Sequence, residues 1–238
     1  MLGSKAFQNS WAKLLASLFF LLTASQLCIA APYSDQLAVR DDQRIYSRAL
    51  TPELADYKRK IEAADADKTI VGTSETKFFD FTPAGNHLTG SSSFAGCFGV
   101  IIATKQGAII GHYNLDQAGL DKAKDEIPAL YKEHNDLVGG GAPHLYSAVE
   151  YETGELVEPN LFNEYKRFLN ELVGTDPAEH TYTEVGEIIV NEDLEEWDDD
   201  FVSGGFVVEN AGGGKADTRL FFINIEHMKG SLRPGQGN

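Results

Sequence analysis

Two apolar runs separated by a short turn constrain the fold of this chain more than any other feature. Residues 98–113 read FGVIIATKQGAIIGHY, and the β-branched residues on both sides of KQG are typical of strands. Gly107 can adopt a positive φ in a tight turn at KQG. The sequence therefore predicts a β-hairpin with strands over 98–104 and 108–113.

Three further segments have the pattern of helices. The first begins at TPELADYKRKIEAA, where Thr51 can cap the helix and Leu54, Tyr57 and Ile61 fall on one face. A second helix over 115–134 should be kinked or split at Pro128. The clearest helix is PNLFNEYKRFLNELVG, residues 159–174, because its apolar residues form one stripe.

Strands and turns occupy the rest of the chain. The segment 82–93, TPAGNHLTGSSS, is rich in turn-forming residues and predicts a loop. Strand-forming residues occur in five other segments, at 69–81, 144–151, 181–190, 205–210 and 220–225. This order predicts a mixed α/β (α+β) fold, with a layered β-sheet core or β-sandwich flanked by helices.

The N-terminus is typical of a secretory signal peptide. Two lysines precede the apolar stretch LLASLFFLLTASQLCIA, which ends in small residues near Ala30 and Ala31. We therefore expect a signal peptide over 1–30, a polar leader and helix over 31–67, and one catalytic-type α/β domain over 68–238. The alternative is a signal anchor, although SQLC interrupts the apolar run. The localisation predicted is secreted, with no membrane partner for the mature chain.

The charge of the chain argues against some partners. The formal net charge is −16, which repels the phosphates of nucleic acids and of anionic membranes. Residues 191–200, NEDLEEWDDD, could attract calcium, but they lack the ligand spacing and glycine of a calcium loop. We read them as a solvated acidic loop, and we expect neither a metal site nor a cofactor.

The mature chain should contain a single cysteine. Cys28 lies in the predicted signal peptide, which leaves Cys97. An odd cysteine in a secreted protein suggests a reactive thiol or an intermolecular disulfide, whereas the alternative is a small buried hydrophobic residue.

His112 lies near this cysteine in the predicted hairpin. If the chain reverses around Gln106, His112 falls opposite position 100, and a shift of one or two residues brings it diagonally beside Cys97. A thiolate–imidazolium pair is then within reach, and backbone N–H groups around Cys97 could form an oxyanion hole.

The pattern Gly–Cys–strand–turn–strand–His, with His112 fifteen positions after Cys97, resembles the CheD-like cysteine deamidases. That superfamily includes the chemotaxis-receptor deamidase CheD, the cytotoxic necrotizing factors and the Burkholderia lethal factor. The resemblance implies a layered β core flanked by helices and hydrolysis of a glutamine side-chain amide. It implies that Cys97 is the nucleophile and His112 the general base.

The resemblance also implies a group that orients the histidine. Several members have a threonine six residues before the cysteine, and this chain has Ser91 there. Ala95 replaces a serine found in some toxins. These departures leave other orienting groups open, namely Ser92, Thr89 and Asn114.

The function expected is that of a secreted cysteine hydrolase, a toxin-like or effector-like protein glutamine deamidase. Its partner would be a protein substrate that offers a glutamine side chain. The alternative is a non-catalytic, acidic, secreted binding protein on the same scaffold, in which Cys97 is structural or forms a dimer.

Overall fold

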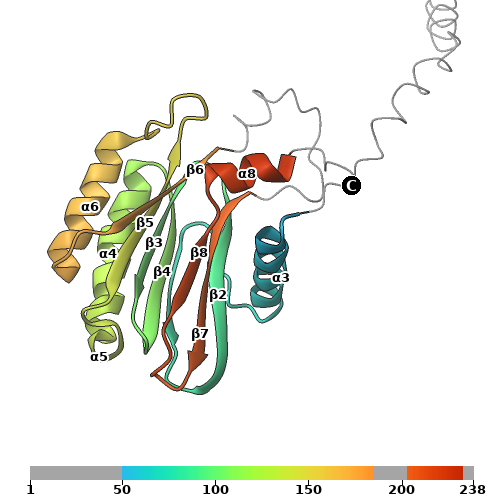
Figure 1. Ribbon diagram of the computed structural model, residues 1–238. Coiled ribbons are helices and arrows are strands. Elements are labelled where there is room, and N and C mark those ends of the chain that lie inside the picture. Colours follow the sequence, from blue (N-terminus) through green and yellow to red (C-terminus); the bar gives the residue numbers. More distant parts are fainter. Residues whose placement is uncertain (1–49, 185–202, 233–238) are drawn as a thin grey trace, which may run out of the picture. The chain divides into compact units, whose positions relative to one another are not determined.

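The computed structural model describes residues 50–184 and 203–232 (Figure 1). Within these residues the chain forms a five-stranded sheet, a three-stranded sheet and five helices, so the predicted mixed α and β class is confirmed. The signal peptide predicted over 1–30, residues 31–49 and the acidic segment 191–200 lie outside the described residues.

The five-stranded sheet contains the predicted hairpin. Its order is β1-β4-β3-β5-β6, and all neighbours are antiparallel except β5 and β6. The hairpin prediction is confirmed, with a register that runs from Ala103 opposite Ala108 to Cys97 opposite Asn114. The strands are β1 (Glu75–Asp80), β3 (Cys97–Ala103), β4 (Gly107–Asn114), β5 (Ala142–Val149) and β6 (Ala178–Thr183).

The turn of the hairpin differs from its prediction. Gly107 does not adopt a positive φ. It is required for packing instead, because a Cβ at this position would lie 2.9 Å from the Phe79 carbonyl oxygen and from Cε2 of Phe78. The Thr104 hydroxyl holds the turn by accepting the backbone N–H groups of Gln106, at 3.0 Å, and Gly107, at 3.1 Å.

The three-stranded sheet corrects the loop predicted over 82–93. This segment forms most of the long strand β2 (Ala84–Phe94), which pairs with β7 (Gly204–Gly212), and β7 pairs with β8 (Arg219–Phe222). Glycine, serine and asparagine have low strand propensity. The backbone pairing with β7, more than 100 residues later in the sequence, overrides that preference.

Helices cover the outer faces of both sheets (Figure 1). On the five-stranded sheet lie α4 (Gln117–Glu133) and α6 (Pro159–Val173), while α3 (Pro52–Ala66) packs on β2 and β7. The two remaining helices are α5 (Asn135–Val138) and α8 (Ile225–Leu232), and α8 was not predicted.

Two predicted helix ends are confirmed, and the predicted break in a third helix is absent. Thr51 caps α3 by accepting the Leu54 N–H at 3.3 Å, and Gly174 ends α6 with a φ of 85°. Pro128 lies inside α4 without splitting it.

The five-stranded sheet separates two cores. Alternate residues of β3 point to opposite faces, so Phe98, Val100 and Ile102 pack against α4 and α6, whereas Cys97 and Ile101 face the three-stranded sheet. Gly99 lies on the same face as Cys97, between the two sheets. The candidate site therefore belongs to the layer between the sheets.

Replacing Gly99 with alanine should destabilise this layer. A Cβ at Gly99 would lie 2.8 Å from Cε1 of Phe206 and 3.1 Å from the Phe94 ring, and both rings are fully buried. We expect Gly99→Ala to lower the free energy of unfolding by about 1–3 kcal/mol, measured by urea denaturation. Gly72→Ala is the matched control, because its new Cβ would make only an ordinary contact at 3.5 Å. Equal stability of the two variants would contradict this packing.

Candidate active site

A bulge in β2 points two side chains toward the same histidine. Ser91 pairs with Phe206 and Phe94 with Gly204, which leaves one extra residue in β2 between these two pairs. Ser93, within the bulge, has a φ of 62°. In a regular strand, residues 91 and 94 would point to opposite faces. The bulge turns both inward, and both are fully buried.

Ser91 contacts the imidazole of His112, on β4 of the other sheet. Its Oγ lies 2.8 Å from His112 Nδ1 and donates a hydrogen bond to the Val71 carbonyl at 2.6 Å. Since the serine proton is directed to Val71, Nδ1–H donates to the serine oxygen and Nε2 carries the free lone pair. Nε2 lies 3.5 Å from the Thr73 Oγ1.

Of the four orienting groups considered from the sequence, Ser91 is the one that meets the imidazole. Thr89 instead donates to the Thr69 carbonyl at 2.6 Å. Within the described residues, no hydrogen bond joins Ser92 or Asn114 to His112.

The imidazole is neutral in the folded protein. The Phe94 ring stacks on it with centroids 3.9 Å apart, and the histidine is fully buried. Burial lowers the pKa of His112 to about 4, and the Val71 carbonyl offsets this only in part. The residue can therefore accept a proton at neutral pH, but it is not an imidazolium in this state.

Cys97 shares a sheet face with His112. The register places Cys97 opposite Asn114 and Gly99 opposite His112, so thiol and imidazole are diagonal neighbours on one face. A hairpin that reverses around Gln106 would place His112 opposite position 100, and the observed register differs from it by one residue. Among the described side chains, however, no hydrogen bond joins the thiol to the imidazole.

The surroundings of Cys97 favour the neutral thiol. The residue is 7% exposed, and burial is the main cause of its raised pKa. The carboxylates of Glu184 and Asp116 raise this pKa further, whereas the Ala95 backbone N–H lowers it. The thiolate–imidazolium pair expected from the sequence is therefore wrong for this state, because both partners are neutral when buried.

The backbone of Cys97 is bound by a tyrosine that the sequence did not point to. Tyr182 Oη accepts the Cys97 N–H at 2.7 Å and donates to the Cys97 carbonyl at 2.7 Å. An oxyanion hole needs free N–H donors. The amide expected to serve this purpose is therefore already occupied. Tyr182 lies on β6, 85 residues from Cys97, and no local motif marks it.

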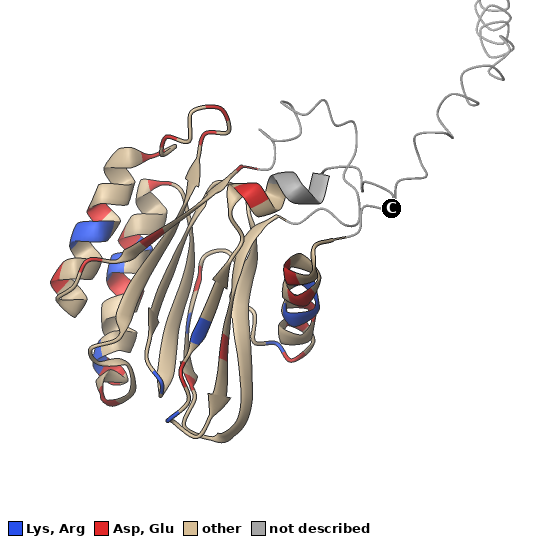
Figure 2. Cartoon of the chain, in the orientation of Figure 1, with Lys and Arg blue, Asp and Glu red and all other residues tan. Residues whose placement is uncertain are grey.

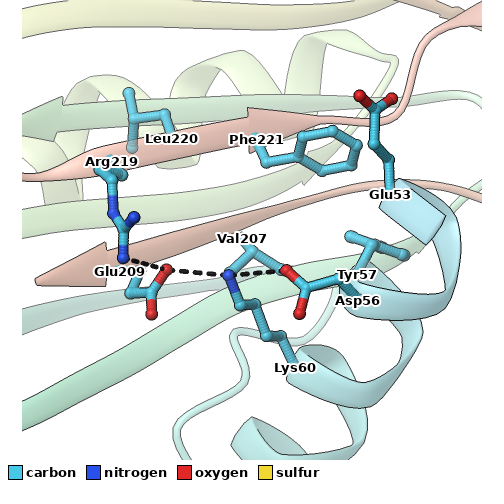
Figure 3. Close-up of a pocket in the computed structure, with 9 residues that line it drawn as sticks. All are labelled: Glu53, Asp56, Tyr57, Lys60, Val207, Glu209, Arg219, Leu220 and Phe221. Atoms are coloured by element: carbon cyan, nitrogen blue, oxygen red, sulfur yellow. Dashed lines mark hydrogen bonds and ion pairs between the residues drawn. The ribbon is translucent and has the colours of Figure 1, made fainter.

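A separate surface pocket lies between α3, β7 and β8 (Figure 3). Its charged side chains are paired: Lys60 contacts Asp56 and Glu209 at 2.9 Å each, and Arg219 contacts Glu209 at 3.1 Å. Its volume of about 210 Å³ is smaller than that of most ligand sites. The pocket is not lined by any of the three predicted site residues.

The comparisons with known proteins add no relative. No protein-family model and no curated protein sequence matches the chain.

The described helices include none that is both long and apolar enough to cross a membrane. In the same residues, no three His, Cys, Asp or Glu side chains are grouped so that they could hold a metal ion. Figure 2 shows acidic and basic residues mixed on the helices, while the strands are mostly uncharged.

The buried neutral histidine predicts a loss of stability in acid. Because the pKa of His112 falls from 6.5 to about 4 on folding, the unfolded chain binds the proton more readily between these values. Its contribution to stability is complete above pH 6.5 and is lost as the pH falls toward 4. Between pH 7.5 and pH 5 this residue should lower the free energy of unfolding by about 2 kcal/mol. We expect His112→Asn to abolish that part of the pH dependence, measured by urea denaturation at both pH values. An unchanged difference would contradict the buried neutral state.

Proposed function

We propose that the chain is a secreted cysteine hydrolase that deamidates glutamine side chains of another protein, as the CheD-like enzymes do. The observation that carries this proposal is the 2.8 Å contact between Ser91 and His112 Nδ1. This contact leaves Nε2 as the proton acceptor, on the sheet face that also carries Cys97. A buried histidine with this orientation has the tautomer that a general base requires.

The reaction follows from these groups. His112 Nε2 takes the Cys97 proton as Sγ attacks the carbon of the side-chain amide, and the same proton then leaves with the amine as ammonia. Water adds to the thioester, releases glutamate and returns a proton to the thiol. Since thiol and imidazole are both neutral at rest, proton transfer accompanies the attack rather than preceding it.

The second candidate is a non-catalytic binding protein on the same scaffold. It is favoured by the burial of Cys97, by its raised pKa and by the hydrogen bonds that occupy its backbone. A cysteine in such surroundings can act as a small core residue.

The two candidates differ in their products. The mature chain is incubated with proteins that have exposed glutamines, and intact-mass and peptide mass spectrometry record the gain of about 1 Da that accompanies amide hydrolysis. We expect this gain with the wild-type chain and none with Cys97→Ala. His112→Ala should lower the rate by about 10²–10⁴-fold, because it removes the base.

Ser91→Ala tests the contact that supports the proposal. We expect it to lower the deamidation rate by about 10–100-fold, because the imidazole loses the partner that fixes its tautomer. Thr89→Ala is the matched control, since that hydroxyl is also buried but bonds to Thr69. Deamidation that persists in Cys97→Ala, or that is absent for every substrate with the wild-type chain, would favour the binding protein.

A further inference from the structure

The Tyr182 hydroxyl occupies the position at which an oxyanion hole beside Cys97 would bind a carbonyl oxygen. Its oxygen lies 2.7 Å from the Cys97 backbone nitrogen and accepts the N–H group of that residue. A backbone N–H group beside a nucleophile is the kind of donor that forms an oxyanion hole. The phenol oxygen therefore stands where the carbonyl oxygen of a substrate amide would be bound.

The Glu184 side chain, from the residue directly after β6, also lies close to the backbone before Cys97. A Cβ at Gly96 would lie 2.6 Å from Glu184 Oε1, so the carboxylate lies directly over Gly96, the residue before Cys97. Gly96 has a φ of 79° at the point where the chain passes from β2 to β3. Residues 182 and 184 lie two positions apart, which in extended backbone directs both side chains to one side.

We propose that the carboxyl-terminal end of β6 and the residue directly after it inhibit the Cys97 site: the Tyr182 hydroxyl fills the oxyanion position, and the Glu184 carboxylate lies over Gly96, the residue before the thiol. This inference rests on the proposed role of Cys97 as the nucleophile. A substrate amide must displace the Tyr182 oxygen before its carbonyl can accept the Cys97 N–H group. The described state is thus a resting, closed form of the site.

The charges around the thiol agree with this assignment. The titratable groups that lie near it on this side of the sheet come from the end of β6 and the residue after it, from the link between β4 and α4, and from β4; they are Tyr182, Glu184, Asp116 and His112. The carboxylates of Glu184 and Asp116 are the negative charges in this set, and both disfavour a thiolate. Among the described side chains, no lysine or arginine forms an ion pair with either one.

Removing the Tyr182 hydroxyl should make Cys97 more reactive. The second-order rate of alkylation by iodoacetamide is measured at pH 7.5 on the full mature chain, by intact mass. We expect Tyr182→Phe to raise this rate by about threefold or more, because the Cys97 N–H group becomes free to bind the carbonyl of the reagent and to stabilise the thiolate.

Tyr146→Phe is the matched control for loosened packing. The Tyr146 hydroxyl is also buried, and it likewise bridges a backbone N–H and a carbonyl, those of Gly205 at 3.0 Å and Ile223 at 2.5 Å. This variant loses the same kind of hydrogen bonds without touching Cys97. Its alkylation rate should stay at the wild-type value.

Glu184→Gln tests the second contact without removing a core hydrogen bond. We expect its alkylation profile to shift to lower pH, with a rate about threefold higher at pH 7.5, because a negative charge beside the thiol is lost. Glu179→Gln is the control on the same strand, since Glu179 pairs with Lys166 on the exposed surface and should leave the profile unchanged.

The outcomes separate this inference from the proposed function. Faster alkylation in both variants, relative to their controls, supports the inhibitory role of β6; equal rates in variants and controls overturn it. If Tyr182→Phe does not fold, Glu184→Gln decides alone. Faster alkylation together with faster deamidation supports both proposals, whereas faster alkylation with no deamidation of any substrate supports the inhibition and counts against the hydrolase.

Discussion

The hydrogen bond between Ser91 and His112 joins the two sheets at the centre of the molecule, and the candidate site depends on it. Ser91 belongs to the three-stranded sheet and His112 to the five-stranded one. The β2 bulge lets Ser91 and Phe94 approach the imidazole from one strand, one as a hydrogen-bond partner and the other as a stacked ring. Burial between the sheets then keeps the histidine neutral and its tautomer defined.

The same burial restrains the cysteine. A thiol buried between two sheets, beside two carboxylates, stays protonated, so the burial that keeps His112 neutral also disfavours the thiolate of Cys97. Tyr182 adds to this restraint by holding the Cys97 backbone through both of its polar groups. In the proposed hydrolase, the substrate would have to complete a site with an oriented base and a protonated nucleophile, and this requirement would limit the reaction of Cys97 with other thiol reagents.

Ser91 is the position at which the proposed resemblance to CheD-like deamidases meets an observed contact. A hydroxyl six residues before the cysteine reaches the histidine because the bulge and the turn at Gly96 bring the end of β2 beside β4. Serine provides the same oxygen as the threonine found in several members of that group.

The sequence by itself determined the hairpin and the caps of α3 and α6, because alternation, capping and turn chemistry act over a few residues. It left open whether Cys97 and His112 share a face, which the register of the hairpin decided in the structure. It misread residues 82–93 as a loop, since the partner that makes them a strand lies in β7. Only the tertiary structure decided which hydroxyl contacts His112, that burial favours the neutral forms of His112 and Cys97, and that Tyr182 binds Cys97 from 85 residues away. Hydrogen-bond partners and burial depend on segments distant in the chain, and no local pattern encodes them.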